Sequence, residues 1–180
     1  MKQSKKLIRN CWIILFVLWA TYYFGGYYLS EEKCIADILK VNYVKDVEKV
    51  MSLDRGNDML HLYSNGTDEN AIVITTKCGL LYHRGDYYFD FISPYKKEGF
   101  ELLQCSNSEY GLTAFIYRYD KNIQMIEVEM NDDTSLVLSD WKGDFLGFSL
   151  EKESYKGGKY VGGEFRAYDK DYNLVETRGY

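Results

Sequence analysis

The chain has 180 residues, of which 46% are hydrophobic and 27% are charged, and its net charge at pH 7 is −5. All 27 acidic residues follow Leu29, whereas 4 of the 22 basic residues precede it, so residues 31–180 carry a net charge of −9. A surface of that sign repels nucleic acid and anionic lipid headgroups, which disfavours both as partners of this part of the chain.

The first predicted element is a membrane anchor over residues 11–29. This run from Cys11 to Leu29 holds nineteen residues without a charged side chain. A helix rises about 1.5 Å per residue, so about twenty apolar residues cross a hydrocarbon core of about 30 Å. Trp12 stands near one end of the run and four tyrosines, Tyr22, Tyr23, Tyr27 and Tyr28, near the other. Aromatic rings favour the membrane–water interface, so both ends suit a transmembrane helix.

The charges that flank this run predict its orientation. Four basic residues, Lys2, Lys5, Lys6 and Arg9, precede it, and no acidic residue does. The positive-inside rule therefore places residues 1–10 in the cytoplasm as a basic tail and residues 31–180 outside it.

Two other interpretations of the run are less favourable. A cleaved signal peptide needs small residues before its cleavage site, and only Gly25 and Gly26 are small here. A buried helix of a soluble protein rarely runs this long beside a basic cluster. We therefore expect an uncleaved signal-anchor and a single-pass protein of the cell membrane, with an extracytoplasmic C-terminal domain.

Residues 31–180 are long enough for one domain with its own core. A short helix is expected over residues 31–40. Ser30 is a good N-cap, and Glu31 and Glu32 suit the positive end of a helix dipole. Ile35 and Ile38 have helical spacing. This helix leads into a β-rich region, with strands expected over 50–54, 59–64, 71–77, 79–83, 86–91, 100–104, 112–119, 123–130, 134–138, 145–150, 164–168 and 174–177.

The predicted fold class is α+β: a mostly antiparallel β domain with one short leading helix, after a single transmembrane helix. Asn65-Gly66 predicts a tight hairpin turn, and residues 126–130 alternate strictly between apolar and polar side chains, so that strand has one buried and one solvated face. Pro94 divides the β-rich region, and residues 31–94 and 100–180 could form separate sheets.

Three cysteines, Cys34, Cys78 and Cys105, lie outside the predicted anchor. They permit one disulfide, and the pair Cys78–Cys105 is favoured because each residue follows a strand-like run. The alternative is that no disulfide forms and all three are small core residues. Their spacing matches no metal or redox motif, and no cofactor is expected.

The chain resembles small membrane-anchored proteins of low-GC Gram-positive bacteria that have no assigned activity. The features that carry the resemblance are short motifs spread over most of the chain: Ser30-Glu31-Glu32-Lys33-Cys34-Ile35, Met59-Leu60-His61-Leu62-Tyr63, Lys77-Cys78-Gly79-Leu80-Leu81, Ile126-Glu127-Val128 and Phe165-Arg166-Ala167-Tyr168-Asp169. The resemblance implies the membrane location and a β-rich architecture, and nothing about activity.

Each candidate for chemistry has a simpler structural explanation. Asp169, Asp171 and Asn173 have the spacing of the first calcium-loop ligands, but the later positions do not match and a hairpin turn is favoured. Arg84-Gly85-Asp86 is an adhesion tripeptide, which we interpret as a turn at Gly85. Asn65-Gly66-Thr67 matches a glycosylation acceptor but suffices as a turn.

The remaining candidates are histidines, carboxylates and an aromatic stretch. His61 and His83 fall in strands with no nearby nucleophile, so neither is expected to be a catalytic base. Glu127 and Glu129 share one face of a strand and are expected to be solvated charges. The aromatic stretch Tyr87, Tyr88, Phe89, Phe91 and Tyr95 is expected to be core and cross-strand packing, although it is the best place for an exposed patch. We therefore expect no catalytic, cofactor-binding or metal site.

The expected function is that of a non-enzymatic binding or accessory module, anchored in the bilayer by residues 11–29, whose partner is a protein or another envelope component. The alternative is an envelope hydrolase, which predicts a cleft where carboxylates or a histidine converge.

Overall fold

The computed structural model describes residues 2–92, 96, 98–108, 111–129, 135–151 and 164–179. Over these residues the chain has two N-terminal helices and is otherwise built of antiparallel strands in three sheets. The predicted mostly antiparallel β architecture with a leading helix is confirmed.

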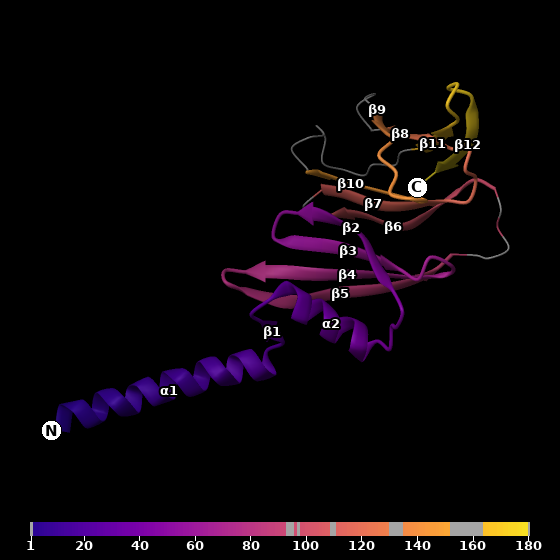
Figure 1. Cartoon of the computed structure of the whole chain (residues 1–180). Coiled ribbons are helices and arrows are strands. Elements are labelled where there is room, and N and C mark those ends of the chain that lie inside the picture. The colour runs from indigo at the N-terminus through magenta and orange to yellow at the C-terminus, as the bar shows by residue number, and fades with distance from the viewer. Residues whose placement is uncertain are drawn as a thin grey trace.

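The first helix, α1 (Lys2–Phe24), stands away from the rest of the molecule (Figure 1). Its segment Lys6–Phe24 is long and apolar enough to cross a membrane, with a mean hydropathy of 1.4 and none of its residues buried. This segment lies closer to the N-terminus than the predicted run of residues 11–29. The helix ends at Phe24 because two glycines follow and Gly26 has a φ of +68°, a backbone conformation that terminates helices. Tyr27 and Tyr28 form a short strand, β1 (Tyr27–Tyr28), instead of extending the helix.

The second helix, α2 (Glu31–Val41), has the predicted position. The Ser30 side chain caps its N-terminus by accepting a hydrogen bond from the backbone amide of Lys33, at 3.3 Å. Cys34, Ile35 and Ile38 form its buried face and pack against Val73 of the adjacent sheet. The predicted amphipathic helix is therefore confirmed, including its cap.

The strands form three sheets, named here A, B and C. Sheet A has the order β1-β5-β4-β3-β2, sheet B the order β10-β7-β6, and sheet C the order β12-β11-β8-β9. The bounds are β2 (Glu48–Arg55), β3 (Asp58–Ser64), β4 (Glu69–Cys78), β5 (Leu81–Phe91), β6 (Phe100–Ser108), β7 (Gly111–Arg118), β8 (Met125–Glu129), β9 (Ser135–Leu138), β10 (Phe145–Glu151), β11 (Glu164–Tyr168) and β12 (Leu174–Gly179).

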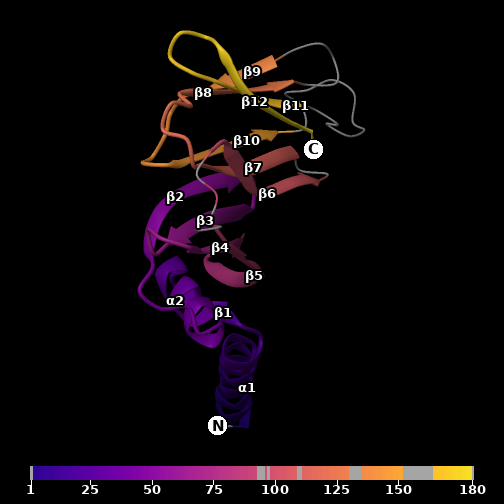
Figure 2. The same ribbon diagram turned by 90° about the vertical axis from the view of Figure 1, so that its right-hand side faces the viewer.

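Helix α2 and the three sheets stack as four layers in the order α2, A, B, C, and both views show sheet C as the layer farthest from α1 (Figures 1 and 2). Three apolar clusters hold the layers together. Cys34, Ile35, Ile38 and Val73 lie between α2 and sheet A. Leu60, Leu62, Ile72, Ile74 and Phe115 lie in the cluster between sheets A and B, and Ile116, Ile126, Val128, Leu146 and Phe165 in the cluster between sheets B and C.

Strand β7 shows why sheet B has two apolar faces. Phe115 belongs to the cluster on the sheet A side, whereas Ala114 and Ile116 belong to the cluster on the sheet C side, and all three side chains are fully buried. Successive side chains of a strand point to opposite faces, so a strand buried on both faces is apolar throughout.

Two predictions about local structure have different outcomes. The strict alternation of β8 is confirmed, because Ile126 and Val128 are buried whereas Glu127 and Glu129 are not. The interpretation of Gly85 as a turn is wrong: residues 81–91 form one strand, and a Cβ atom at Gly85 would lie 2.8 Å from the carbonyl oxygen of Ile74. Glycine is needed there for close approach of β4 to β5.

The hairpin at Asn65-Gly66 is present, with residues 65–68 as its loop. The side-chain Oδ1 of Asn65 accepts hydrogen bonds from the backbone amides of Thr67, Asp68 and Glu69. Pro94, the predicted divider of the β-rich region, lies outside the described residues. Residues 27–91 form sheet A, and residues 100–179 form sheets B and C. The described part of the second segment therefore has two sheets, where one sheet for each segment was considered.

Gly147 of β10 provides a test of the contact between sheets A and B. A Cβ atom there would lie 2.6 Å from Met51 Sδ, 3.1 Å from Phe115 and 3.2 Å from Leu53. We expect Gly147→Ala to lower the free energy of unfolding by about 1–3 kcal/mol through overpacking, measured by chemical denaturation of the full chain in detergent micelles. Gly179→Ala is the matched control, because nothing lies within 4 Å of its Cβ position, and equal losses for both variants would contradict the assigned packing.

Candidate functional site

A buried polar network surrounds His61 on the face of sheet A that α2 covers. The His61 side chain is 0% exposed. Its Nδ1 lies 2.8 Å from Ser52 Oγ, and its Nε2 lies 3.2 Å from Thr75 Oγ1 and 3.3 Å from Glu31 Oε1. The network therefore joins three neighbouring strands to the first residue of α2.

Strand register and the helix cap bring these four residues together. Ser52 and His61 are direct cross-strand partners of β2 and β3, so their side chains share one face of the sheet. Thr75 pairs with Met59, two residues before His61, and shares that face as a diagonal neighbour. Glu31 reaches the sheet because the Ser30 cap fixes where α2 begins.

The hydrogen bonds assign the protons of the network. The Thr75 hydroxyl donates to Glu31 Oε1 at 2.9 Å, so Thr75 Oγ1 accepts from the Nε2–H of His61. The Nδ1 atom then accepts from the Ser52 hydroxyl, and a neutral imidazole satisfies both ring nitrogens. Burial lowers the pKa of His61, and the positive charge of Lys49 lowers it further, whereas Glu31 acts in the opposite direction. The described ring is therefore neutral near pH 7.

The network has the connectivity of a nucleophile, a base and an orienting acid. Ser52, His61 and Glu31 stand in the order found in serine hydrolases, where a histidine accepts the hydroxyl proton and a carboxylate holds the other ring nitrogen. The prediction that His61 has no nucleophile nearby is therefore wrong, since Ser52 is its cross-strand partner. Catalysis also requires that substrate reach the base, and this imidazole is fully buried.

A second polar cluster fixes the segment that follows α1. The Tyr28 hydroxyl donates to Asp37 Oδ2 at 2.5 Å, and Arg84 Nη1 lies 3.6 Å from the same oxygen. Burial and this hydrogen bond raise the pKa of Tyr28 to about 12, and burial raises the pKa of the neighbouring Cys34 thiol to about 11. Both groups therefore stay protonated at neutral pH and hold α2 and β5 against β1.

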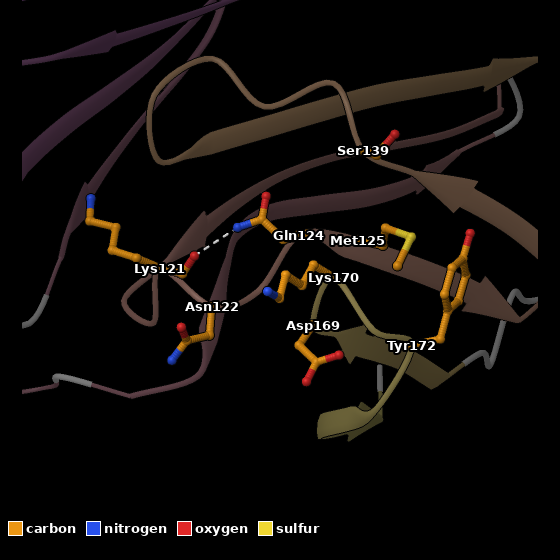
Figure 3. Close-up of a pocket in the computed structure, with 8 residues that line it drawn as sticks. All are labelled: Lys121, Asn122, Gln124, Met125, Ser139, Asp169, Lys170 and Tyr172. Atoms are coloured by element: carbon orange, nitrogen blue, oxygen red, sulfur yellow. Dashed lines mark hydrogen bonds between the residues drawn. The ribbon is translucent and has the colours of Figure 1, made fainter.

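A polar hollow of about 590 Å³ opens at one end of sheet C (Figure 3). Tyr172 is 74% exposed, and Figure 3 shows its ring beside Met125, with Lys170 lying toward Asn122 and Gln124. The lining residues are Lys121, Asn122, Gln124, Met125, Ser139, Asp169, Lys170 and Tyr172. An exposed ring beside amides and charged groups can bind a polar ligand or a segment of another protein.

The predicted turn at residues 169–173 forms one wall of this hollow and is confirmed. Asp169 Oδ1 accepts hydrogen bonds from the backbone amides of Asp171 and Asn173, at 2.8 and 2.9 Å. The other oxygen accepts from the Asn173 side chain at 2.9 Å, so the turn itself occupies the carboxylate. In the described part of the chain, no group of three or more His, Cys, Asp or Glu residues could hold a metal ion.

The carboxylates Glu127 and Glu129 lie on the outer face of sheet C and have cross-strand partners. Tyr168 donates its hydroxyl hydrogen to Glu127 Oε2 at 2.8 Å, which lowers the pKa of that carboxyl group. The Arg166 guanidinium pairs with both Glu129 and Glu164. These carboxylates are the solvated charges that the alternating pattern predicted.

The other predicted candidates lie elsewhere in the fold. Arg84 pairs with Asp37, as described, and His83 packs against the Tyr27 ring with ring centroids 5.0 Å apart. In the aromatic stretch, Tyr87 packs under α2, whereas Tyr88 and Phe89 are 39% and 40% exposed. The side chain of Phe91 and residue 95 lie outside the described residues.

The favoured Cys78–Cys105 disulfide is contradicted. Cys78 is an exposed free thiol at the end of β4 in sheet A, whereas Cys105 belongs to β6 in sheet B, and its side chain lies outside the described residues. Cys34 is a buried free thiol, as expected for a small core residue. The hairpin end of β4 and the middle of β6 are in different layers, which sequence spacing does not reveal.

No protein-family model, curated protein or solved structure matches the chain.

The His61 network predicts a specific dependence of stability on pH. Because burial lowers the pKa of His61 in the folded state, the unfolded chain binds the proton more tightly and acid favours unfolding. We expect the free energy of unfolding to be largest above the ordinary histidine pKa of about 6.5 and to fall as the pH drops below that value. Circular dichroism of the full chain in detergent during denaturation measures this dependence.

Two variants separate His61 from other acid-sensitive groups. We expect His61→Gln to lose about 1–3 kcal/mol near neutral pH, because one flexible amide does not replace both ring-nitrogen contacts with the Ser52 and Thr75 hydroxyls. The variant should also flatten the dependence on pH below the ordinary histidine pKa. His83→Gln is the control and keeps the wild-type slope. An unchanged slope in His61→Gln would show that other groups cause the acid sensitivity.

Proposed function

We propose that the protein is a single-pass membrane protein whose α1 holds a non-enzymatic binding module at the outer face of the membrane. The observation that carries the proposal is the exposure of α1. Between residues 7 and 19, ten large apolar side chains of α1 are more than half exposed, and in chain order they are Leu7, Ile8, Trp12, Ile13, Ile14, Leu15, Phe16, Val17, Leu18 and Trp19. Full burial of one such side chain is favourable by about 1.5–3 kcal/mol, so transfer of this exposed apolar surface into lipid is favourable.

The charge distribution supports the proposed orientation. Basic residues occupy the N-terminal end of α1, no acidic residue lies in it, and its C-terminal end leads into a domain of net charge −9. By the positive-inside rule the N-terminus remains in the cytoplasm. Sheet C is then free to meet a partner, because it is the layer farthest from α1 (Figure 2).

The hollow at sheet C is the best-supported place for partner binding. Exposed apolar side chains also lie on both edge strands of the same sheet, with Leu174 of β12 and Val137 of β9 each 57% exposed. An exposed aromatic residue beside polar groups is a common composition of a binding surface. The acidic domain favours a neutral or basic protein or envelope component over nucleic acid.

Residue accessibility in intact cells tests the topology. In a Cys78→Ser background, we expect a membrane-impermeant maleimide to label Lys170→Cys in intact cells, because Lys170 is exposed in the turn before β12. Gln3→Cys in the same background is the matched control and should react only after lysis. Labelling of Gln3→Cys alone in intact cells would reverse the orientation.

The second candidate is an envelope hydrolase, and the Ser52–His61–Glu31 geometry favours it specifically. In such an enzyme Ser52 Oγ would attack an ester or amide carbonyl while His61 Nδ1 accepts its proton. The full burial of the imidazole argues against this activity in the described conformation.

A fluorophosphonate probe distinguishes the two candidates, because it phosphonylates only a serine that its histidine activates. We expect no labelling of Ser52 in the full chain in native membranes, with a known serine hydrolase added as the positive control. Labelling that disappears in both Ser52→Ala and His61→Gln would establish the hydrolase and overturn the non-enzymatic proposal.

A further inference from the structure

The turn between β4 and β5 presents an exposed leucine. Leu80 is 92% exposed, the highest value among the large hydrophobic residues that the structure describes. It follows Gly79, whose φ of +66° produces the turn, and Lys77 and Cys78 before it are exposed as well. A single exposed leucine is common on protein surfaces, so its position in the fold decides whether it has a role.

The turn is tied directly to the end of α1. Strand β1 begins three residues after Phe24 and pairs with β5, with Tyr27 opposite His83 and Tyr28 opposite Tyr82. The Cβ position of Gly26 is 3.7 Å from the Arg84 guanidinium. The start of β5 is therefore fixed against the segment that leaves α1, and Leu80 lies two residues before Tyr82.

The direction of α1 gives the turn its orientation. Figure 1 shows that α1 extends to the same side of the domain as the β4–β5 turn and that, in this view, α1 and the strands of sheet A run in a similar direction. If α1 crosses a bilayer, the end of sheet A that carries these turns therefore faces the membrane surface.

We propose that the β4–β5 turn, residues 78–81, is a second membrane contact in which Leu80 enters the boundary between lipid headgroups and acyl chains. The proposal rests on the proposed function, since it requires α1 to lie in the bilayer. Lys77 can extend its ammonium group to the headgroups while its aliphatic part follows the leucine, and Tyr82 suits the interface.

The neighbouring turn of sheet A shows what distinguishes this contact. Residues 55–58 join β2 to β3 on the same side of the domain and carry an ion pair between Arg55 and Asp58, with no apolar side chain between them. Only the β4–β5 turn of this pair can bury an apolar side chain in lipid. Because α1 already tethers the domain, the second contact is intramolecular and a single leucine suffices to fix the tilt of the domain.

Fluorescence quenching by nitroxide lipids tests this contact. The full chain is placed in nanodiscs of zwitterionic phosphatidylcholine, with an environment-sensitive fluorophore on the exposed native Cys78. We expect a nitroxide near the acyl carbonyl to quench this fluorophore more than a nitroxide near the acyl terminus, as an interfacial depth requires. Leu80→Asp should abolish most of that quenching.

Two further labelled positions distinguish failure of the second contact from failure of the membrane anchor. They are Val17→Cys and Lys170→Cys, each in a Cys78→Ser background. Val17 lies within α1 and should be quenched best by the deep nitroxide, whereas Lys170 should not be quenched. If Val17 is quenched while the Cys78 label behaves like the Lys170 label, or if Leu80→Asp changes nothing, the second contact is refuted and the anchor stands. If Val17 is not quenched, the proposed membrane anchor itself is refuted.

Discussion

No part of the chain that the structure describes covers the apolar surface of α1, and this constraint determines how the rest of the molecule can work. The helix is apolar enough to span a bilayer, and its span has no buried residue. In water, the exposed leucine, isoleucine, phenylalanine and tryptophan side chains of α1 would be hydrated. The hydrophobic effect makes that hydration unfavourable. In the proposed arrangement lipid removes that cost, and the acidic four-layer domain remains in solution.

The connection between α1 and the domain is short, so a restraint on the helix acts on the sheets. Only Gly25 and Gly26 separate α1 from β1, and β1 is a strand of sheet A. Tyr28, Asp37 and Arg84 then join β1, α2 and β5 through a hydrogen bond and an ion pair. The His61 network joins the start of α2 to three strands of the same sheet. Protonation of the buried His61 imidazole would weaken the contact between α2 and sheet A.

Features that depend on neighbouring residues could be predicted from the sequence. Ser30 and the spacing of Ile35 and Ile38 predicted α2 because caps and helical periodicity are local. Alternation predicted the two faces of β8 for the same reason. The end of α1 could not be predicted, because Tyr27 and Tyr28 are as compatible with an anchor as with the edge strand that they form. Gly85 was interpreted as a turn because a pattern cannot show that Ile74 approaches its backbone.

The candidate sites depended on contacts that the sequence does not encode locally. Ser52 meets His61 through the register of a hairpin. Glu31, 30 residues before His61 in the chain, reaches the imidazole only after α2 docks on the sheet. One local feature could have indicated the Ser52–His61 pair: residues 52–64 can form a hairpin with its turn at residues 55–58. The register of that hairpin places Ser52 opposite His61. The hollow at sheet C joins residues 121–125 to residues 169–172 across β8 and β11, which no spacing rule connects.

The proposed burial of α1 in lipid is tested most directly by hydrogen exchange of the full chain in lipid nanodiscs, followed by mass spectrometry. Water is scarce in the hydrocarbon core, so amides of residues 11–24 should exchange at least as slowly as those of the central strand β4. An isolated helix in water frays and opens readily, because no tertiary packing supports it. Rapid exchange throughout residues 11–24 in nanodiscs, with β4 still protected, would contradict the membrane anchor while leaving the fold of the domain intact.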